Sequence, residues 1–285
     1  MVIDITDQIV HKAYTPRPLE SKKYDYGHLL VVGGSRQYTG APQLVARAAM
    51  RAGCDLATII APQRAADAAT QDPNFVTSPL EGDVISVRHL IHIRDAMAHK
   101  TAMVIGNGAG RDRRTFDALR LILKECGIPA VVDADAIRAV GEKGVEMERG
   151  KPFVFTPHVG EFLALTGIDL APLPFVERTE EVKSAAQKLR CVVVLKGNKD
   201  IISDGEEIAV NATGTPFMTK GGTGDVLAGI IGALLARGVA PFFAAQAGCF
   251  LSGKAGERAS ASKGEGVLAT DVIEEMPTVL RDVLG

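Results

Sequence analysis

Lys220-Gly221-Gly222-Thr223-Gly224-Asp225 is followed at once by Val226-Leu227-Ala228-Gly229-Ile230-Ile231-Gly232-Ala233-Leu234-Leu235. In the second part, large aliphatic residues recur at the i, i+3, i+4 and i+7 spacing of one helical face, at Leu227, Ile230, Ile231 and Leu234. The pattern predicts a buried helix that begins near Thr223, with Thr223 as its N-cap. We expect the rest of the chain to be arranged around this helix and the glycine cluster in front of it.

The glycine cluster predicts a site for an anion. The first turn of a helix has N–H groups without intrahelical partners and the positive end of the helix dipole, and glycines let a phosphate approach that backbone closely. Asp225 at the same place is unfavourable beside a phosphate unless it accepts a proton from a reacting group. This indicates phosphoryl transfer with Asp225 as general base. The simpler interpretation is a Gly-rich turn with a helix-capping acid, and these six residues alone do not distinguish the two.

The composition is that of an ordinary soluble protein. Of 285 residues, 46% are hydrophobic and 23% charged, and the net charge of -2 with no long run of Lys or Arg gives no support for nucleic-acid or membrane-surface binding. The N-terminus lacks the features of a signal peptide, and the longest mostly apolar stretch, Val226 to Ala236, is too short to cross a bilayer. We therefore expect a cytoplasmic protein. The four cysteines form no CxxC pair and are expected to be reduced core residues, at Cys54, Cys126, Cys191 and Cys249.

Short apolar runs alternate with helical patterns along the chain. Strands are predicted at residues 28–32, 55–60, 101–105, 129–132, 152–155 and 191–195, with shorter β segments at 200–203 and 207–210. Two helices, at about 242–261 and 270–283, are expected to end the chain. Such alternation predicts an α/β fold, with a mainly parallel central sheet and helices on both faces. We expect an N-terminal arm over residues 1–27 and a single domain over residues 28–285.

Polar and glycine-rich loops follow several of these strands. Gly106 to Gly110 could cradle a phosphate, although the spacing is not the GxGxxG of a Rossmann site. Asp133 and Asp135 either hold Mg²⁺, directly or through water, or cap the next helix. Because the carboxyl ends of parallel strands share one edge of a sheet, we expect these loops to line one cleft.

Two further loops carry charged residues. His158 and Glu161 lie at the start of a predicted helix. The helix dipole alone can explain Glu161, whereas His158 is the better candidate for a substrate contact. Lys196-Gly197-Asn198-Lys199-Asp200 is either a site for nucleotide phosphate or ribose or a solvated hairpin.

With these residues in view, the chain resembles the NAD(P)H-hydrate dehydratases of the ribokinase-like superfamily. Five blocks carry the match and span residues 28 to about 238. They are Val31–Ser35 with Tyr38–Pro42, Gly106–Gly110, Val132–Ala136, Thr156–Glu161 and Gly214–Leu227. Gly222-Thr223-Gly224-Asp225 is shared with many ribokinase-like kinases, whereas Tyr38–Pro42 and Thr156–Glu161 are more specific to the dehydratases. The bifunctional members carry an N-terminal epimerase domain, which the 27 residues before the first block do not provide, so a stand-alone dehydratase is expected.

The resemblance implies a substrate and a reaction. The substrate is the S hydrate of NADH or NADPH (NADHX or NADPHX), in which water has added to the nicotinamide ring. A second nucleotide, ADP or ATP, phosphorylates the ring hydroxyl, and elimination of phosphate restores the cofactor. Asp225 is then the general base. The implied hydrate contacts are Ala41, Gly108, His158 and Asp225, and the implied donor-nucleotide contacts are Lys196, Gly197, Asn198, Lys199, Asp200 and Gly224.

The resemblance also implies Mg²⁺ with the nucleotide, without assigning its ligands, and a homo-oligomer, for which a tetramer is common in the family. It favours ADP over ATP as donor and leaves the choice between NADHX and NADPHX open. Three residues depart from the family pattern, Asn107 where Pro is usual, Asp200 where Thr is usual and Phe217 where Gly is common. Two other hypotheses are a ribokinase-like kinase of a small vitamin precursor, such as a hydroxymethylpyrimidine or thiazole alcohol, and a non-catalytic nucleotide-binding module.

Overall fold

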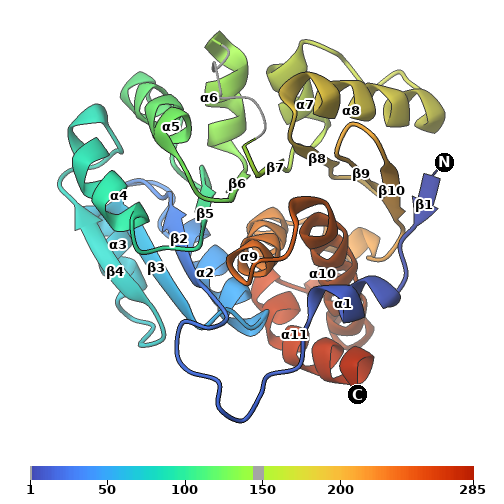
Figure 1. Cartoon of the computed structure of the whole chain (residues 1–285). Coiled ribbons are helices and arrows are strands. Elements are labelled where there is room, and N and C mark those ends of the chain that lie inside the picture. The colour runs from blue at the N-terminus through green and yellow to red at the C-terminus, as the bar shows by residue number, and fades with distance from the viewer. Residues whose placement is uncertain (1, 144–150) are drawn as a thin grey trace.

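A computed structural model describes residues 2–143 and 151–285. Within these residues a ten-stranded sheet runs through the centre of the molecule in the order β1-β10-β9-β8-β7-β6-β5-β2-β3-β4 (Figure 1). The strand β9 is antiparallel to both of its neighbours, and the other neighbouring pairs are parallel. The predicted α/β fold with a mainly parallel sheet is confirmed. The strands are β1 (Val2–Asp4), β2 (His28–Val32), β3 (Leu56–Pro62), β4 (Val76–Leu80), β5 (Ala102–Ile105), β6 (Ala130–Val132), β7 (Phe153–Phe155), β8 (Val192–Leu195), β9 (Asp200–Ser203) and β10 (Ile208–Asn211).

Helices cover both faces of the sheet, as predicted (Figure 1). They are α1 (Gln8–Ala13), α2 (Ala41–Arg51), α3 (Gln63–Ala69), α4 (Leu90–Met97), α5 (Arg113–Glu125), α6 (Asp135–Lys143), α7 (Val159–Thr166), α8 (Phe175–Leu189), α9 (Thr223–Ala236), α10 (Pro241–Lys263) and α11 (Ala269–Leu284). The predicted strands lie within two residues of those observed. Two strands, β1 and β4, and three helices, α3, α4 and α8, were not predicted. β4 lies at one edge of the sheet and contains Pro79, which a central strand disfavours.

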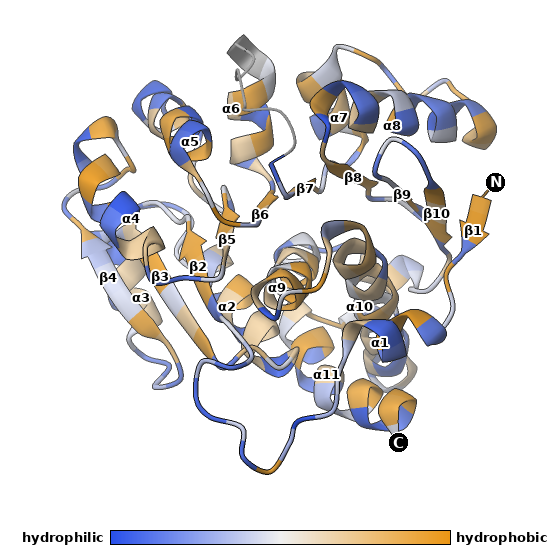
Figure 2. Cartoon of the chain, in the orientation of Figure 1, coloured by the Kyte–Doolittle hydropathy of each residue, from blue (hydrophilic) through white to orange (hydrophobic). Residues whose placement is uncertain are grey.

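Alternate residues of each central strand enter opposite cores. In β2, Leu29 and Val31 pack with α2, α9 and α10, whereas Leu30 and Val32 pack with the layer of α4 to α8. Helix α9 is apolar around its circumference because it lies between the sheet and the helices α2, α10 and α11. Hydrophobic residues accordingly follow the strands and α9, while hydrophilic residues cover the outer surfaces of α5 and α8 (Figure 2). This burial fixes the start of α9 against the sheet.

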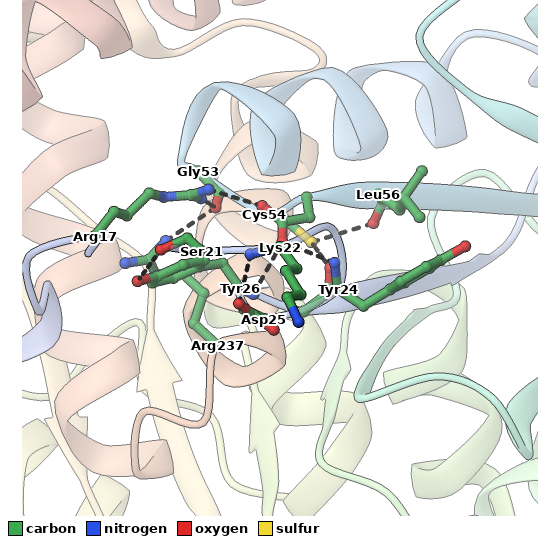
Figure 3. A network of polar contacts seen from close by, with 12 residues as sticks. Arg17, Ser21, Lys22, Tyr24, Asp25, Tyr26, Gly53, Cys54, Leu56 and Arg237 are labelled. Atoms are coloured by element: carbon green, nitrogen blue, oxygen red, sulfur yellow. Dashed lines mark hydrogen bonds and ion pairs between the residues drawn. The ribbon is translucent and has the colours of Figure 1, made fainter. Parts of the chain in front are cut away.

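The N-terminal residues before β2 are attached to the sheet and to the start of β3. The strand β1 extends the sheet beside β10. The Arg17 guanidinium forms an ion pair with Asp55 at 2.9 Å, donates to the carbonyl of Gly53 and lies 3.8 Å from the centre of the Tyr26 ring. Arg237, at the end of α9, donates to the same Gly53 carbonyl, so one network joins the N-terminal segment to α9 (Figure 3). The boundary between arm and domain at residue 28 stays a prediction.

The four cysteines are buried free thiols, which confirms the expectation for their oxidation state. Burial raises the pKa of Cys191 to about 11, so its thiol is protonated at neutral pH. Across the described ranges, no helix combines the length and the apolar character needed to cross a membrane.

Candidate active site

The candidate site lies where the chain order of the sheet reverses. The strand β2 has β3 on one side and β5 on the other, and ligands of open α/β folds bind beside such a switch point at the carboxyl ends of the strands. The two loops that follow β2 and β5 contact each other there, because the Gly34 N–H donates to the Asn107 carbonyl at 2.8 Å. The strand-end loops were expected to line one cleft, and the structure divides them between two cavities at this edge of the sheet.

Helix α9 begins at Thr223, as predicted, but Thr223 is not its N-cap. The N-cap is Gly222, whose φ of 98° is left-handed, and the helix has no side-chain cap. The Thr223 hydroxyl instead donates to the carbonyls of Met218 and Lys220, each at 2.9 Å. The Thr223 side chain therefore closes the preceding turn. The Thr223 N–H donates to the Lys220 carbonyl, and the N–H groups of Gly224 and Asp225 remain available for a ligand.

Substitution of Gly222 by Ala is expected to destabilise the fold by about 1–3 kcal/mol. The added Cβ would require a left-handed backbone and would lie 2.7 Å from a Leu44 methyl carbon and 2.9 Å from the Ala269 Cβ. Urea unfolding measures the change. Gly221→Ala is the matched control, because nothing lies within 4 Å of its added Cβ, and equal losses in the two variants would contradict this account.

Asp225 lies in the first turn of α9. It faces Asn107, which belongs to the loop after β5. The Asn107 amide donates to Asp225 Oδ1 at 2.7 Å and to Asp133 Oδ2 at 2.9 Å. Burial raises the pKa of Asp225 from 3.8 to about 7, with the nearby charge of Asp133 adding to the effect and the Asn107 hydrogen bond opposing it. A carboxyl group with this pKa can exchange a proton near neutral pH, which suits a general base.

The Lys196 ammonium group lies between two carboxylates of the site, those of Asp133 and Glu161. It lies 2.8 Å from Asp133 Oδ1 and 3.6 Å from Glu161 Oε2. Thr156 also donates to Asp133 Oδ1, at 2.8 Å. Burial lowers the pKa of Lys196, but the charges of Asp133 and Glu161 outweigh it and the pKa is raised. Lys196 therefore remains charged, and it neutralises part of a cluster in which Asp225 is the third carboxylate.

Two cavities open beside the start of α9. The first has a volume of about 940 Å³, and its lining includes Ala41, Gly108 and Asp225. The second has a volume of about 720 Å³, and its lining includes the backbone at Gly224 and the loop after β8. Both volumes are typical of small-molecule sites. Because Gly224 and Asp225 are adjacent, one helical turn contributes to both cavities.

The structure separates the predicted site residues between these cavities. Ala41 and Gly108 line the first cavity together with Asp225. Gly108 packs so closely against Ala41 that a Cβ on Gly108 would lie 2.9 Å from the Ala41 Cβ. Lys196, Gly197, Asn198, Asp200 and Gly224 line the second cavity. Lys199 does not line it, and its ammonium group lies 5.8 Å from the centre of the Phe175 ring.

His158 lines the second cavity and not the first, where its predicted partners lie. It is also the N-cap of α7. Its Nδ1 accepts from the N–H groups of Gly160 and Glu161, and the Glu161 carboxylate accepts from the His158 N–H. The expected capping role of Glu161 is confirmed. Capping accounts for His158 Nδ1, whereas Nε2 lies 3.5 Å from Glu161 Oε1 in a side chain that is half exposed.

Asp133 and Asp135 have structural partners in place of a preformed metal site. Both carboxylate oxygens of Asp133 accept hydrogen bonds, and Asp135 accepts from the Gly110 N–H at 2.8 Å in the first turn of α6. In the part of the chain that the structure describes, no group of three or more His, Cys, Asp or Glu residues has the arrangement of a metal site. The two carboxylates therefore accept hydrogen bonds from neighbouring loops and from Lys196, and the choice between Mg²⁺ ligation and helix capping stays a prediction.

Several lining residues were not identified from the sequence. In the first cavity they include Arg36, Arg64 and Arg111. In the second they include Thr215 and Ser252. No motif marked them, since each arginine is an ordinary surface residue in sequence and Ser252 lies inside helix α10. Only the fold brings them to the cavities.

Comparison with known proteins gives a consistent family. A sequence model described as NAD(P)H-hydrate dehydratase matches residues 29–278. The bifunctional NAD(P)H-hydrate repair enzyme of Pyrobaculum aerophilum is 44% identical over 268 residues, which are 93% of this chain and 52% of that protein. The ADP-dependent (S)-NAD(P)H-hydrate dehydratase of Cenarchaeum symbiosum is 35% identical, over 97% of this chain and 96% of that one.

A solved structure agrees with these relatives. The ADP/ATP-dependent NAD(P)H-hydrate dehydratase from Bacillus subtilis, co-crystallised with ATP and Mg²⁺, superimposes with a TM-score of 0.83 at 27% identity and covers 98% of this chain and 97% of that one. The chain spans about half the length of the bifunctional relatives it matches.

Proposed function

The chain belongs to the NAD(P)H-hydrate dehydratase family, and from this premise we propose that it converts the S hydrates of NADH and NADPH back to the intact cofactors with ADP as co-substrate. The enzyme would be a hydro-lyase of nicotinamide nucleotide repair. The first cavity would hold the hydrate, with Ala41, Gly108 and Asp225 in contact with it. The second would hold ADP, against Gly197, Asn198 and Gly224.

Asp225 would accept the proton of the ring hydroxyl while the hydroxyl oxygen attacks the β-phosphorus of ADP. The new P–O bond forms as the bond to AMP breaks, and AMP leaves. The ring C–O bond then breaks, phosphate departs with the oxygen of the added water, and loss of a proton from the adjacent ring carbon restores the double bond. The N–H groups at the start of α9 would stabilise charge on the transferred phosphoryl group.

The other predicted contacts follow from this arrangement. His158 lines the ADP cavity, whereas the resemblance assigns it to the hydrate. We propose that contact, which requires the nicotinamide ring to extend past Asp225 toward the ADP cavity. Lys196 and Asp200 would border the donor nucleotide, and the contact predicted for Lys199 stays a proposal. Mg²⁺ would enter with ADP and neutralise phosphate charge, held mainly by phosphate oxygens and water.

One observation carries the proposal. Gly224 and Asp225 are consecutive residues, and they line different cavities of nucleotide size. A phosphate bound at the N–H groups of α9 and a hydroxyl beside the Asp225 carboxylate would therefore meet at one helical turn. Such proximity of donor and acceptor would support phosphoryl transfer between the two ligands.

The test is the recovery of absorbance at 340 nm when the purified chain is incubated with S-NADHX, Mg²⁺ and either ADP or ATP. We expect recovery with release of AMP and inorganic phosphate when ADP is supplied, and none without nucleotide. No recovery with either nucleotide would overturn the proposal. Accumulation of a stable phosphorylated product would instead assign the chain to the ribokinase-like kinases. The same assay with S-NADPHX decides the substrate preference.

The rate should depend on pH through the Asp225 carboxyl group. Because the base must be ionised and its pKa is about 7, kcat/KM for S-NADHX should fall about tenfold per pH unit below pH 7 and level off above it. Initial rates between pH 5.5 and 9 measure this, with the far-ultraviolet circular dichroism of the protein recorded at each pH to show that the fold is kept. A flat profile between pH 6 and 8 would contradict the assigned pKa.

We further propose a cytoplasmic homo-oligomer, with the tetramer as the expected form and no nucleic-acid or membrane partner. These points rest on the resemblance and on the composition. Light scattering of the purified protein tests the tetramer.

A further inference from the structure

Asn107 occupies the space between two carboxylates, at the end of β5. Its side chain is fully buried. One amide nitrogen spans the two acids, at 2.7 Å from Asp225 Oδ1 and 2.9 Å from Asp133 Oδ2. Both N–H bonds of the amide are therefore used by acidic partners, and the opposite amide orientation would place the Asn107 oxygen against the carboxylates.

The Asn107 side chain oxygen has no hydrogen-bond partner among the described residues, although it is buried. An unpaired buried acceptor usually costs stability. The unpaired oxygen contributes no stabilising contact, so the contacts made by the Asn107 side chain are those of its donor side. That donor side reaches only the two carboxylates.

We infer that Asn107 is a positioning residue for the base, holding Asp225 Oδ1 so that Oδ2 faces the ring hydroxyl. The inference rests on the proposed function. Within the described part of the chain, Asp225 Oδ2 has no hydrogen-bond partner, whereas Oδ1 is held by Asn107. Asn107 thereby fixes which oxygen accepts the proton, and it favours the ionised form of the base.

Three charged side chains near Asp225 also influence its ionisation. They are Asp133 after β6, Glu161 on α7 and Lys196 after β8. The two acids oppose ionisation of Asp225, and Lys196 favours it. Lys196 is itself paired with both of these acids, so Asn107 supplies the hydrogen bond that Asp225 does not receive from a cation.

The test compares Asn107→Ala with Thr156→Val, which removes a hydrogen bond to Asp133 without touching Asp225. In the free protein labelled with ¹³C-aspartate, the Asp225 carboxyl signal is identified by its loss in Asp225→Asn. We expect its titration midpoint to rise by about one pH unit in Asn107→Ala and to stay near the wild-type value in Thr156→Val. The acid limb of kcat/KM should move with it, with kcat lowered at least about tenfold and the KM for S-NADHX changed less.

The Asn107→Ser variant keeps one donor and is expected to titrate between the wild type and Asn107→Ala. It carries the test if the alanine variant does not fold. An unchanged Asp225 midpoint in a folded variant, or failure of both variants to fold, would overturn the inference and assign Asn107 to the fold alone. The titration needs no substrate, and a wild-type chain without 340 nm activity would instead refute the proposed function.

Discussion

Replacement of Asp225 by Asn is expected to lower kcat for S-NADHX by about 10²–10⁴-fold, because the general base is removed. Nucleotide binding should be largely kept, since the second cavity is lined by the backbone of Gly224 and not by Asp225. Single-turnover rates at 340 nm and ADP titration by calorimetry measure the two effects separately. A variant that retains more than about a tenth of the wild-type rate would remove Asp225 from the base role.

The same substitution separates a base from a helix cap by its effect on stability. The pKa of Asp225 is about 7 in the folded protein and 3.8 as its ordinary value, so the folded state binds more protons between these values. The contribution of Asp225 to stability therefore falls as pH rises from about 4 to 7, and the ionised carboxylate costs on the order of a few kcal/mol above that range. At pH 8 the Asn variant should be at least as stable as the wild type.

Asp271→Asn is the matched control for this measurement. Asp271 is also in the first turn of a helix, but it accepts from the Leu268 N–H and from Lys263, and the Lys263 hydrogen bond lowers its pKa. Its loss should lower stability at pH 8 without changing the rate. If Asp225→Asn behaved like Asp271→Asn, Asp225 would be a structural cap.

The sequence predicted the elements whose burial is uniform. Residues 28–32 form a strand with the predicted ends, because each residue after His28 is apolar and fully buried on one face or the other. The short, exposed strand β1 has no such signal, since its Val-Ile-Asp segment is placed in the sheet by pairing with β10. The N-cap at Gly222 was missed for a related reason. Thr is a favoured N-cap residue by local preference, but the left-handed backbone at the observed N-cap favours glycine.

Part of the lining of the candidate site was predictable from the sequence, but its arrangement was not. The motifs placed Asp225, Gly108 and Lys196 at strand ends or a helix start, and the fold does bring them to one edge of the sheet. The ion pair of Lys196 with Asp133 joins residues 63 positions apart, and no spacing rule predicts it. Asn107 appeared in the sequence only as a departure from the family pattern, because its importance lies in contacts that form on folding.

Lys196→Met is expected to destabilise the protein by about 3–5 kcal/mol at pH 8, because it leaves buried carboxylates without their cation. Asp133 is 2% exposed and Glu161 is 6% exposed, and Lys196 is the cation that contacts both. Methionine keeps the length of the side chain and removes the charge. Affinity for ADP should also fall, since Lys196 lines the second cavity. Urea unfolding and calorimetry with ADP measure the two losses.

The pH dependence of that loss identifies its cause. Lys196 favours the ionised form of Asp225. Without it the pKa of Asp225 should rise further in the folded state, so the variant loses more stability than the wild type as pH increases above about 7. The deficit relative to the wild type should therefore be large at pH 8 and smaller at pH 5. Lys199→Met, three residues along and exposed, is the stability control and should lose less than about 1 kcal/mol. A deficit that is the same at both pH values would mean that Lys196 contributes packing by its aliphatic chain, and that the three carboxylates beside α9 do not depend on its charge.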